Sequence, residues 1–288
     1  MEKSISSPKN FRGPKAKLNR PIDLRNLSPE ELKNLQTKKN MLLNPFENMK
    51  IKNGKFLDKI DGRSLCKLCG KSRKYFCYTC YISIPELEND IPRVKLPCLI
   101  DIIKHPKETD GKSTAIHASI IAPKEVQIYT YPDIPDYSKE KNVYLMFPTE
   151  DAVALEDFLN LPTTNDDDAD QTVSHNRLKC SKSISRIIFI DSTWNQTKRL
   201  QNDERLKDLP CLRLNTRETL FWRYQKGKPK TYLATIEAIF YFVKDYHLAF
   251  LRDYYDGEYD NLLFFFKYMY EKIHSLYDSN ELLAYKDI

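Results

Sequence analysis

The sequence predicts an α/β protein in which a mostly parallel sheet carries helices on both faces and follows a small cysteine-rich module. From Leu96 onward, short apolar runs alternate with helix-length amphipathic segments, which is the pattern of strand–helix–strand units around a parallel sheet. Four of the 7 cysteines lie within residues 66–80. With 288 residues, 41% of them hydrophobic, the chain is long enough for one sizeable domain and one small module.

Residues 1–60 are expected to form a basic, partly disordered arm that contains one short helix. Residues 1–75 hold 19 Lys and Arg against 7 Asp and Glu, whereas the remainder holds 27 against 33. Ser28-Pro29-Glu30-Glu31 has the form of a capping box with proline at the first helical position, so we expect a helix to about Asn40. A basic arm on a mildly acidic body is typical of proteins that bind a phosphate backbone, and a solvated tail is the alternative.

Residues 93–288 are expected to form the main domain. Five apolar runs predict strands, at 96–103, 126–129, 143–147, 186–190 and 211–214. Five segments predict helices, at 113–121, 149–159, 194–209, 231–246 and 261–276. Residues 161–182 have no periodicity and are expected to form a surface insertion.

The cysteine-rich segment, residues 61–92, predicts a structural zinc site. The pairs Cys66-x-x-Cys69 and Cys77-x-x-Cys80 supply four thiolates, enough to complete a tetrahedral site with no open position for catalysis. Reduced buried cysteines or a redox dithiol are the alternatives. The basic and aromatic residues of this segment either bind RNA or form an ordinary surface: Lys67, Lys71, Arg73, Lys74, Tyr75, Phe76 and Tyr78.

No apolar stretch approaches the ~18–20 residues of a membrane span, and the first thirty residues lack the apolar centre of a signal peptide. We therefore expect an intracellular protein with reduced cysteines and no membrane association. The basic arm and Lys38-Lys39 favour a nuclear location, with the cytoplasm as a second compartment.

The carboxyl ends of the strands are the expected location of a ligand site, because ligands of parallel sheets bind at that edge. His105, Pro148 and Asp191 each follow a predicted strand and are expected there together. In the stretch IIFIDSTWNQ, Asp191 ends a buried strand, and Thr193 and Trp194 begin the following helix. Taken alone, this stretch fits a helix cap at least as well as a functional site.

Six segments in order resemble the DTW-domain family of tRNA-uridine aminocarboxypropyltransferases, most closely its eukaryotic members that modify a D-loop uridine. Asp191-Ser192-Thr193-Trp194 resembles the Asp-x-Thr-Trp signature of the family. The other matching segments are Cys66–Cys80, His105-Pro106-Lys107-Glu108, Phe147–Ala152, Arg223 and Leu233–Ala238. Ser192 and Ala234 depart from the residues that are common in the family, and both are small.

The resemblance implies a SPOUT-like fold and the transfer of the 3-amino-3-carboxypropyl group of S-adenosylmethionine to uracil N3 in tRNA. Asp191 is expected to accept the N3 proton. The cofactor-binding residues that it implies are Phe147, Pro148, Asp151, Thr193, Trp194, Leu233, Thr235 and Glu237. The residues expected to bind tRNA are Lys107, Arg223, Lys226 and Lys228.

Two other functions remain open, a SPOUT-type RNA methyltransferase and a non-enzymatic zinc-finger RNA-binding factor. Glu237 has alternatives of its own, namely capping its helix or pairing with Arg223. The resemblance implies tRNA as the partner, and no obligate protein partner is expected.

Overall fold

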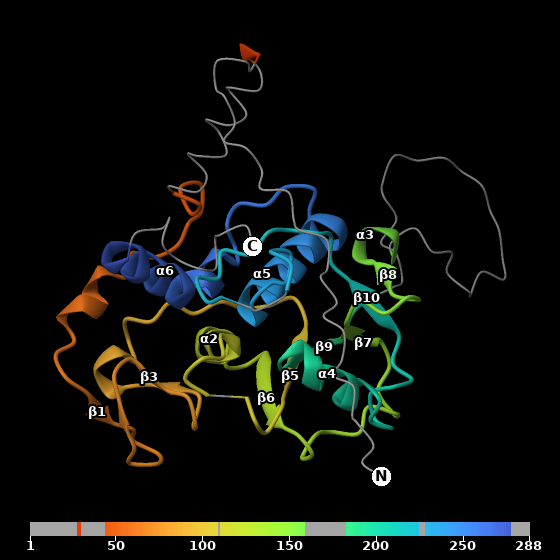
Figure 1. Ribbon diagram of the computed structural model, residues 1–288, viewed down its shortest axis with the longest axis horizontal. Coiled ribbons are helices and arrows are strands. Elements are labelled where there is room, and N and C mark those ends of the chain that lie inside the picture. Colours follow the sequence, from red (N-terminus) through yellow and green to blue (C-terminus); the bar gives the residue numbers. More distant parts are fainter. Residues whose placement is uncertain (1–27, 30–43, 109, 159–182, 225–227, 278–288) are drawn as a thin grey trace, which may run out of the picture. The chain divides into compact units, whose positions relative to one another are not determined.

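The computed structural model describes residues 28–29, 44–108, 110–158, 183–224 and 228–277 (Figure 1). The chain divides into two compact units, Met1–Asn48 and Met49–Ile288. The expected helix up to Asn40 and the expected insertion at 161–182 lie almost wholly outside the described residues.

A six-stranded, wholly parallel sheet forms the centre of the larger unit. Its strands are β5 (Leu99–Lys104), β6 (Val126–Thr130), β7 (Val143–Met146), β8 (Val153–Ala154), β9 (Arg186–Asp191) and β10 (Cys211–Arg213). Their order across the sheet is β6-β5-β9-β7-β10-β8, and every neighbouring pair is parallel. The predicted mostly parallel sheet is confirmed.

Helices cover both faces of this sheet (Figure 1). Successive side chains of β9 point to opposite faces and contact different helices. Phe189 packs against Phe242 of α5 (Thr235–Tyr246), with ring centroids 6.0 Å apart. The adjacent Ile188 lies in a buried cluster with Leu200 of α4 (Trp194–Gln201), which therefore covers the opposite face. Among the described helices, none combines the length and apolar composition that a bilayer crossing requires.

Two further helices pack near α5. The helix α2 (Ala115–Ile121) contacts α5, α6 and the 3₁₀ turn η5 (Asp260–Leu263) that precedes α6. The helix α6 (Phe264–Leu276) begins with three consecutive phenylalanines, all buried. The 3₁₀ turn η2 (Lys55–Lys59) also packs there, because Phe56 stacks on Phe264 at 5.8 Å. Residues 49–60, expected in the arm, thus belong to the larger unit.

Two predicted helices are wrong in extent. The helix expected from Thr149 to Leu159 is only α3 (Leu155–Phe158), because Val153 and Ala154 extend and pair with β10. The helix expected from Trp194 to Leu209 ends at Gln201, where Asp203 accepts hydrogen bonds from the backbone and guanidinium N–H groups of Arg205.

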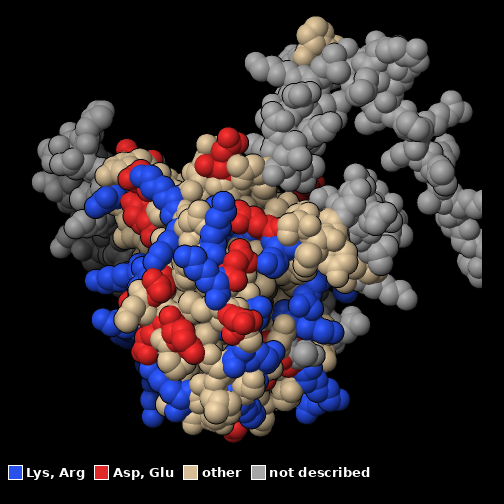
Figure 2. All heavy atoms as spheres, turned by 90° about the vertical axis from the view of Figure 1, so that its left-hand side faces the viewer, with Lys and Arg blue, Asp and Glu red and all other residues tan. Residues whose placement is uncertain are grey.

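The cysteine-rich segment forms two small antiparallel hairpins. The strand β1 (Ser64–Leu65) pairs with β2 (Ser72–Arg73), and β3 (Phe76–Cys77) pairs with β4 (Ile82–Ser83). The side of the molecule that carries these hairpins shows Lys and Arg side chains interspersed with Asp and Glu (Figure 2). Because the charge on this side is mixed, the surface alone does not single out a patch that binds an anion. The basic residues that line cavities are the candidates for binding.

Candidate functional site

Asp191 lies at the carboxyl end of β9, in the middle of the sheet, and its side chain is 5% exposed. Its Oδ2 accepts a hydrogen bond of 2.7 Å from the Ser113 hydroxyl, and its Oδ1 accepts one of 2.7 Å from the Thr235 hydroxyl. Its backbone carbonyl accepts from the His105 N–H at 3.0 Å, so two strand ends meet here as expected. Hydroxyls from two separate segments therefore fix the carboxylate, and a strand end fixes its backbone.

No cation is hydrogen-bonded to the Asp191 carboxylate among the described residues. Burial raises the pKa of this carboxyl, while the hydroxyls of Thr235 and Ser113 and the charge of Lys104 oppose the shift. Lys104 lies opposite Asp191 in the β5–β9 register, but its Nζ contacts Asp110 at 2.5 Å. A carboxylate with a raised pKa is a better proton acceptor near neutral pH than an exposed one.

A first cavity, of about 300 Å³, lies at the carboxyl ends of β7, β9 and β10 and at the start of α5. Its walls are largely apolar, with Phe147, Pro148, Phe189 and Leu233 among them. Polar groups such as Asn215 also line it. Such a cavity suits a small molecule with a flat ring and a polar tail.

A second cavity, of about 390 Å³, contains Asp191 in its wall. It has more charged side chains than the first, because Lys112, Arg223 and Lys228 line it together with the carboxylates of Glu108 and Asp191, whereas Arg213 is the charged residue in the lining of the first. Three residues line both cavities: Ser192, Leu233 and Thr235. The hydroxyl of Thr235 that contacts Asp191 therefore stands at the boundary between the two spaces.

The structure brings part of the predicted cofactor set together. Phe147, Pro148, Leu233 and Thr235 line the first cavity. Thr193 lines the second cavity, and α4 begins at Trp194, as predicted.

Two residues of that set lie elsewhere. Asp151 is exposed in the turn before β8 and lines neither cavity. Glu237 is 2% exposed and also lines neither. Its carboxylate accepts from the backbone N–H of Ala234 and of Leu220 and from the Thr219 hydroxyl. Glu237 therefore caps α5 and ties the preceding loop to it, which was the alternative reading of this residue.

Of the residues expected to bind tRNA, some line the Asp191 cavity and others do not. Arg223 and Lys228 line the Asp191 cavity, whereas Lys107 is exposed outside it. Lys226 lies outside the described residues. Lys112, which sequence reasoning missed, lines the cavity beside Asp191. Ser113 was also missed as a functional residue, because nothing local marks a serine 78 positions from its carboxylate partner.

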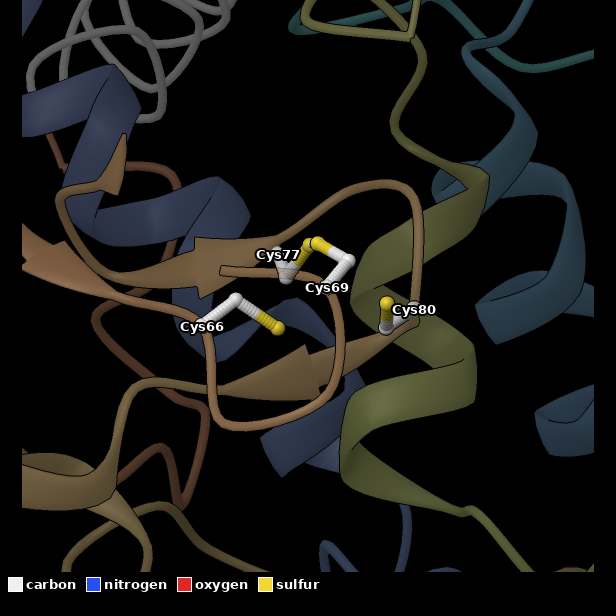
Figure 3. A group of neighbouring side chains, drawn as sticks. All are labelled: Cys66, Cys69, Cys77 and Cys80. Atoms are coloured by element: carbon white, nitrogen blue, oxygen red, sulfur yellow. Dashed lines mark hydrogen bonds between the residues drawn. The ribbon is translucent and has the colours of Figure 1, made fainter. Parts of the chain in front are cut away.

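The four predicted zinc ligands come together within the two hairpins. The sulfur atoms of Cys66, Cys69, Cys77 and Cys80 all lie within 4.8 Å of one another. Those of Cys69 and Cys77 are 3.6 Å apart and point toward one another (Figure 3). A tetrahedral zinc with Zn–S bonds of about 2.3 Å separates its sulfurs by about 3.8 Å, so the arrangement fits this ion.

The acidity of the thiols also fits a cation. Burial opposes ionisation of Cys77, but the amides of Thr79 and Cys80 and the Arg73 guanidinium outweigh it and lower the pKa of that thiol to about 6. Burial and the neighbouring sulfurs raise the pKa of Cys80 to about 12. Four adjacent thiolates repel one another, and a divalent cation bound among them compensates their negative charge. Cys98 and Cys211 stand outside the cluster.

The family model described as the DTW domain matches residues 74–274. The tRNA-uridine aminocarboxypropyltransferase 1 of Homo sapiens is 44% identical over 286 residues, covering 89% of this chain and 94% of that protein. The protein of the same name from Xenopus tropicalis is 46% identical over 254 residues, covering 80% of this chain and 86% of its own length. The Mus musculus protein is 43% identical over 265 residues, with coverages of 82% and 86%.

Among solved structures, the SAM-dependent rRNA:acp-transferase Tsr3 from Vulcanisaeta distributa matches with a TM-score of 0.33 and 18% identity, covering 66% of this chain and 87% of that chain. A TM-score of this size is too low to indicate a shared fold. The family model and the sequence relatives are decisive, since each of them spans most of the chain. The chain belongs to the DTW-domain family.

Proposed function

We propose that this protein transfers the 3-amino-3-carboxypropyl group of S-adenosylmethionine to N3 of a uridine in tRNA. In this reaction the bond between the sulfonium sulfur and the chain carbon breaks, and a bond between that carbon and N3 forms. The electron pair of the broken bond stays on sulfur, which leaves as methylthioadenosine. The N3 proton passes to a base on the protein.

The observation that carries this proposal is the position of Asp191. Its buried carboxylate lines a cationic cavity, and its hydrogen-bond partner Thr235 also lines an adjacent, largely apolar cavity. A transfer between two bound molecules needs two neighbouring spaces, and the loss of the N3 proton needs an acceptor beside the target base. The names of the relatives, tRNA-uridine aminocarboxypropyltransferase 1, support the choice of reaction.

The apolar cavity is assigned to S-adenosylmethionine. Phe147, Pro148 and Phe189 offer apolar surface to the adenine ring, and Asn215 is a polar group available to the amino-acid end. The cavity lies at the carboxyl ends of three parallel strands, where ligands of such sheets bind.

The Asp191 cavity is assigned to the target uridine. Arg223, Lys228 and Lys112 supply positive charge for the phosphates that flank it. Uracil N3 is a poor nucleophile until it loses its proton, and a fixed carboxylate that accepts the proton contributes about 10²–10⁴ in rate. Because the sulfonium offers both a methyl group and a longer chain, the alignment of the two cavities determines which carbon reacts.

A structural zinc ion at Cys66, Cys69, Cys77 and Cys80 is part of the proposal. Metal analysis of the purified full chain should give about one zinc per chain, since the four thiolates form a closed tetrahedral site. Cys77→Ser should lose most of this zinc, whereas Cys211→Ser, at a cysteine outside the cluster, should retain it. Equal zinc in both variants would contradict the site.

Membership of the DTW-domain family also supports a SPOUT-like fold. The basic N-terminal arm supports a nuclear location. The location is tested by imaging the tagged full chain against a version that lacks residues 1–27. Loss of nuclear signal in the shortened chain is the expected result, and unchanged nuclear signal would contradict a targeting role for those residues.

The reaction is tested by incubating the full chain with S-adenosylmethionine and unmodified tRNA. Equal amounts of methylthioadenosine and of aminocarboxypropyl-uridine are expected, measured by mass spectrometry of the small molecules and of digested nucleosides. S-adenosylhomocysteine with a methylated nucleoside would identify a methyltransferase instead. Neither product, with tRNA bound, would point to a binding factor.

A further inference from the structure

A third cavity, of about 190 Å³, lies between the cysteine hairpins and the main domain. It continues the Asp191 cavity, because five residues line both: Lys112, Ser113, Thr114, Phe221 and Arg223. The hairpins contribute the far wall through Arg63, Lys74 and Tyr78. A strand of nucleic acid with its target base beside Asp191 would therefore lead directly into this space.

The charge of the third cavity is strongly positive. Its cationic lining residues are Arg63, Arg73, Lys74, Lys112 and Arg223. Asp110 is the acidic side chain in the lining, and Lys104 neutralises it through an ion pair of 2.5 Å. In the part of the chain that the structure describes, neither Lys112 nor Arg223 has an ion-pair partner, so both charges are available to an anion.

Aromatic rings stand on both walls of this cavity. Tyr75 and Tyr78 belong to the hairpins, and Phe221 and Trp222 belong to the segment before α5. The rings are held in place: the Tyr75 hydroxyl lies 2.9 Å from that of Tyr268, and the Trp222 ring lies 5.2 Å from the Phe266 ring.

A guanidinium packs over the Tyr78 ring. The Arg73 group lies 3.8 Å from the centre of the Tyr78 ring, and Arg73 is 7% exposed. Below the walls, His117 is buried against Phe76 and Phe265, which makes the floor of the cavity largely apolar.

We propose that this third cavity binds one single-stranded nucleotide adjacent to the target uridine, with its base between the aromatic walls and its phosphate on the cations. Stacking rings combined with a cationic track is the usual means of holding unpaired nucleic acid. The cavity has about half the volume of the Asp191 cavity, which suits a single base. The inference rests on the proposed function in taking RNA as the substrate, and it gives the cysteine hairpins a part in binding it.

The test compares two lysines of the hairpins. Lys74 lines the cavity and Lys71 does not, and both are exposed. Binding of a short, fluorescently labelled, single-stranded RNA that contains uridine is measured by anisotropy at several salt concentrations, with the full chain. Lys74→Ala should bind about threefold or more weakly, with the slope of log K against log salt reduced by about 0.7, the value of one lost phosphate contact. Lys71→Ala should bind as the wild type does.

The aromatic wall is tested separately with Tyr78→Leu, which removes the ring and keeps an apolar side chain. Binding about fivefold or more weaker is expected, the lower end of what one stacked base contributes. Because Tyr78 lies between two zinc-site cysteines, zinc content and the melting temperature are measured on the same sample. Phe221→Leu, on the opposite wall and away from the cysteines, should weaken binding in the same direction.

Wild-type binding by Lys74→Ala and Phe221→Leu, or equal weakening by Lys74→Ala and Lys71→Ala, would overturn the inference. The binding measurement requires no turnover, so it is independent of the transfer assay. Transfer by the wild type together with unaffected variants would reject this subsite and leave the proposed reaction standing. Failure of wild-type transfer would reject the reaction itself.

Discussion

Two buried carboxylates, at opposite ends of the parallel strands, differ in their hydrogen-bond partners. Near the amino ends, Asp101 of β5 accepts two hydrogen bonds from the Arg186 guanidinium, at 2.9 and 3.0 Å, and one from the Tyr137 hydroxyl. At the carboxyl ends, Asp191 of β9 accepts, within the described parts of the chain, only from the neutral hydroxyls of Ser113 and Thr235. Burial raises the pKa of both carboxyls, but only Asp101 has a cation in contact that opposes this.

Asp101 therefore stabilises the fold, whereas Asp191 is available for chemistry. Burying a charge costs free energy unless it is paired or hydrogen-bonded, and the Arg186 contact gives Asp101 a cationic partner that Asp191 lacks. Asp101 is 1% exposed and lines none of the three cavities discussed above. The pKa of Asp191 is raised as well, but this carboxylate lines a cavity, and the two properties together mark a functional group.

The largest effect on stability is expected at Asp101. Asp101→Ala leaves the Arg186 guanidinium partly buried without its main partner, so the free energy of unfolding should fall by about 3 kcal/mol, the low end for a broken buried pair. Glu140→Ala is the matched control, because Glu140 contacts the same guanidinium at 2.8 Å from a more exposed position. The control should cost under about 1 kcal/mol, as exposed pairs do. Equal losses in urea unfolding would contradict the distinction.

An intermediate effect on stability is expected at Glu237. This residue is a third buried carboxylate and, like Asp191, it accepts hydrogen bonds from neutral donors. Glu237→Ala removes the acceptor of two backbone N–H groups and one hydroxyl, and unfolding free energy should fall by about 1–3 kcal/mol. The affinity for S-adenosylmethionine, measured by calorimetry on folded protein, should change little. A large loss of cofactor affinity without loss of stability would instead support the role first expected for this residue.

Sequence reasoning identified the sheet and its functional edge because those signals are local. The apolar runs of β5 and β9 read as buried strands, and the rule that parallel strands end at one edge brought His105 and Asp191 together. The two helices that were wrong in extent depended on distant partners. Val153 extends only because Leu212 of β10 is there to pair with it.

The candidate site was predicted only in part for the same reason. Asp191 and Thr235 belong to recognisable motifs, whereas Ser113 and Lys112 are ordinary residues that the fold carries to the carboxylate. The two cavities at the carboxyl ends of the strands form where segments distant in the sequence pack together. The same is true of the third cavity, to which the hairpins contribute a wall. Glu237 lies in a motif as well, but its carboxylate turns away from the cavities toward its own helix end.

The smallest effect is expected at Thr235, whose hydroxyl hydrogen bond lowers the pKa of Asp191. In Thr235→Val this pKa rises further, so the fall in kcat/KM on the acid side should move to higher pH. At neutral pH the rate should fall by less than about tenfold, the value of one hydrogen bond. Thr130→Val, an exposed strand position outside the cavities, should leave the pH profile unchanged. A shift to lower pH in Thr235→Val would contradict the hydrogen-bond assignment.

The most direct measurement is the single-turnover rate of aminocarboxypropyl transfer for Asp191→Asn with saturating tRNA and S-adenosylmethionine, alongside its melting temperature. We expect the rate to fall about 10²–10⁴-fold, as the loss of a general base requires. Because the folded-state pKa of Asp191 is raised, its ionised form disfavours folding above the ordinary pKa of 3.8, so the amide should melt at the same or a higher temperature at neutral pH. A near wild-type rate would contradict the role of Asp191 as the base, and a marked loss of thermal stability would show that this carboxylate serves the fold as Asp101 does.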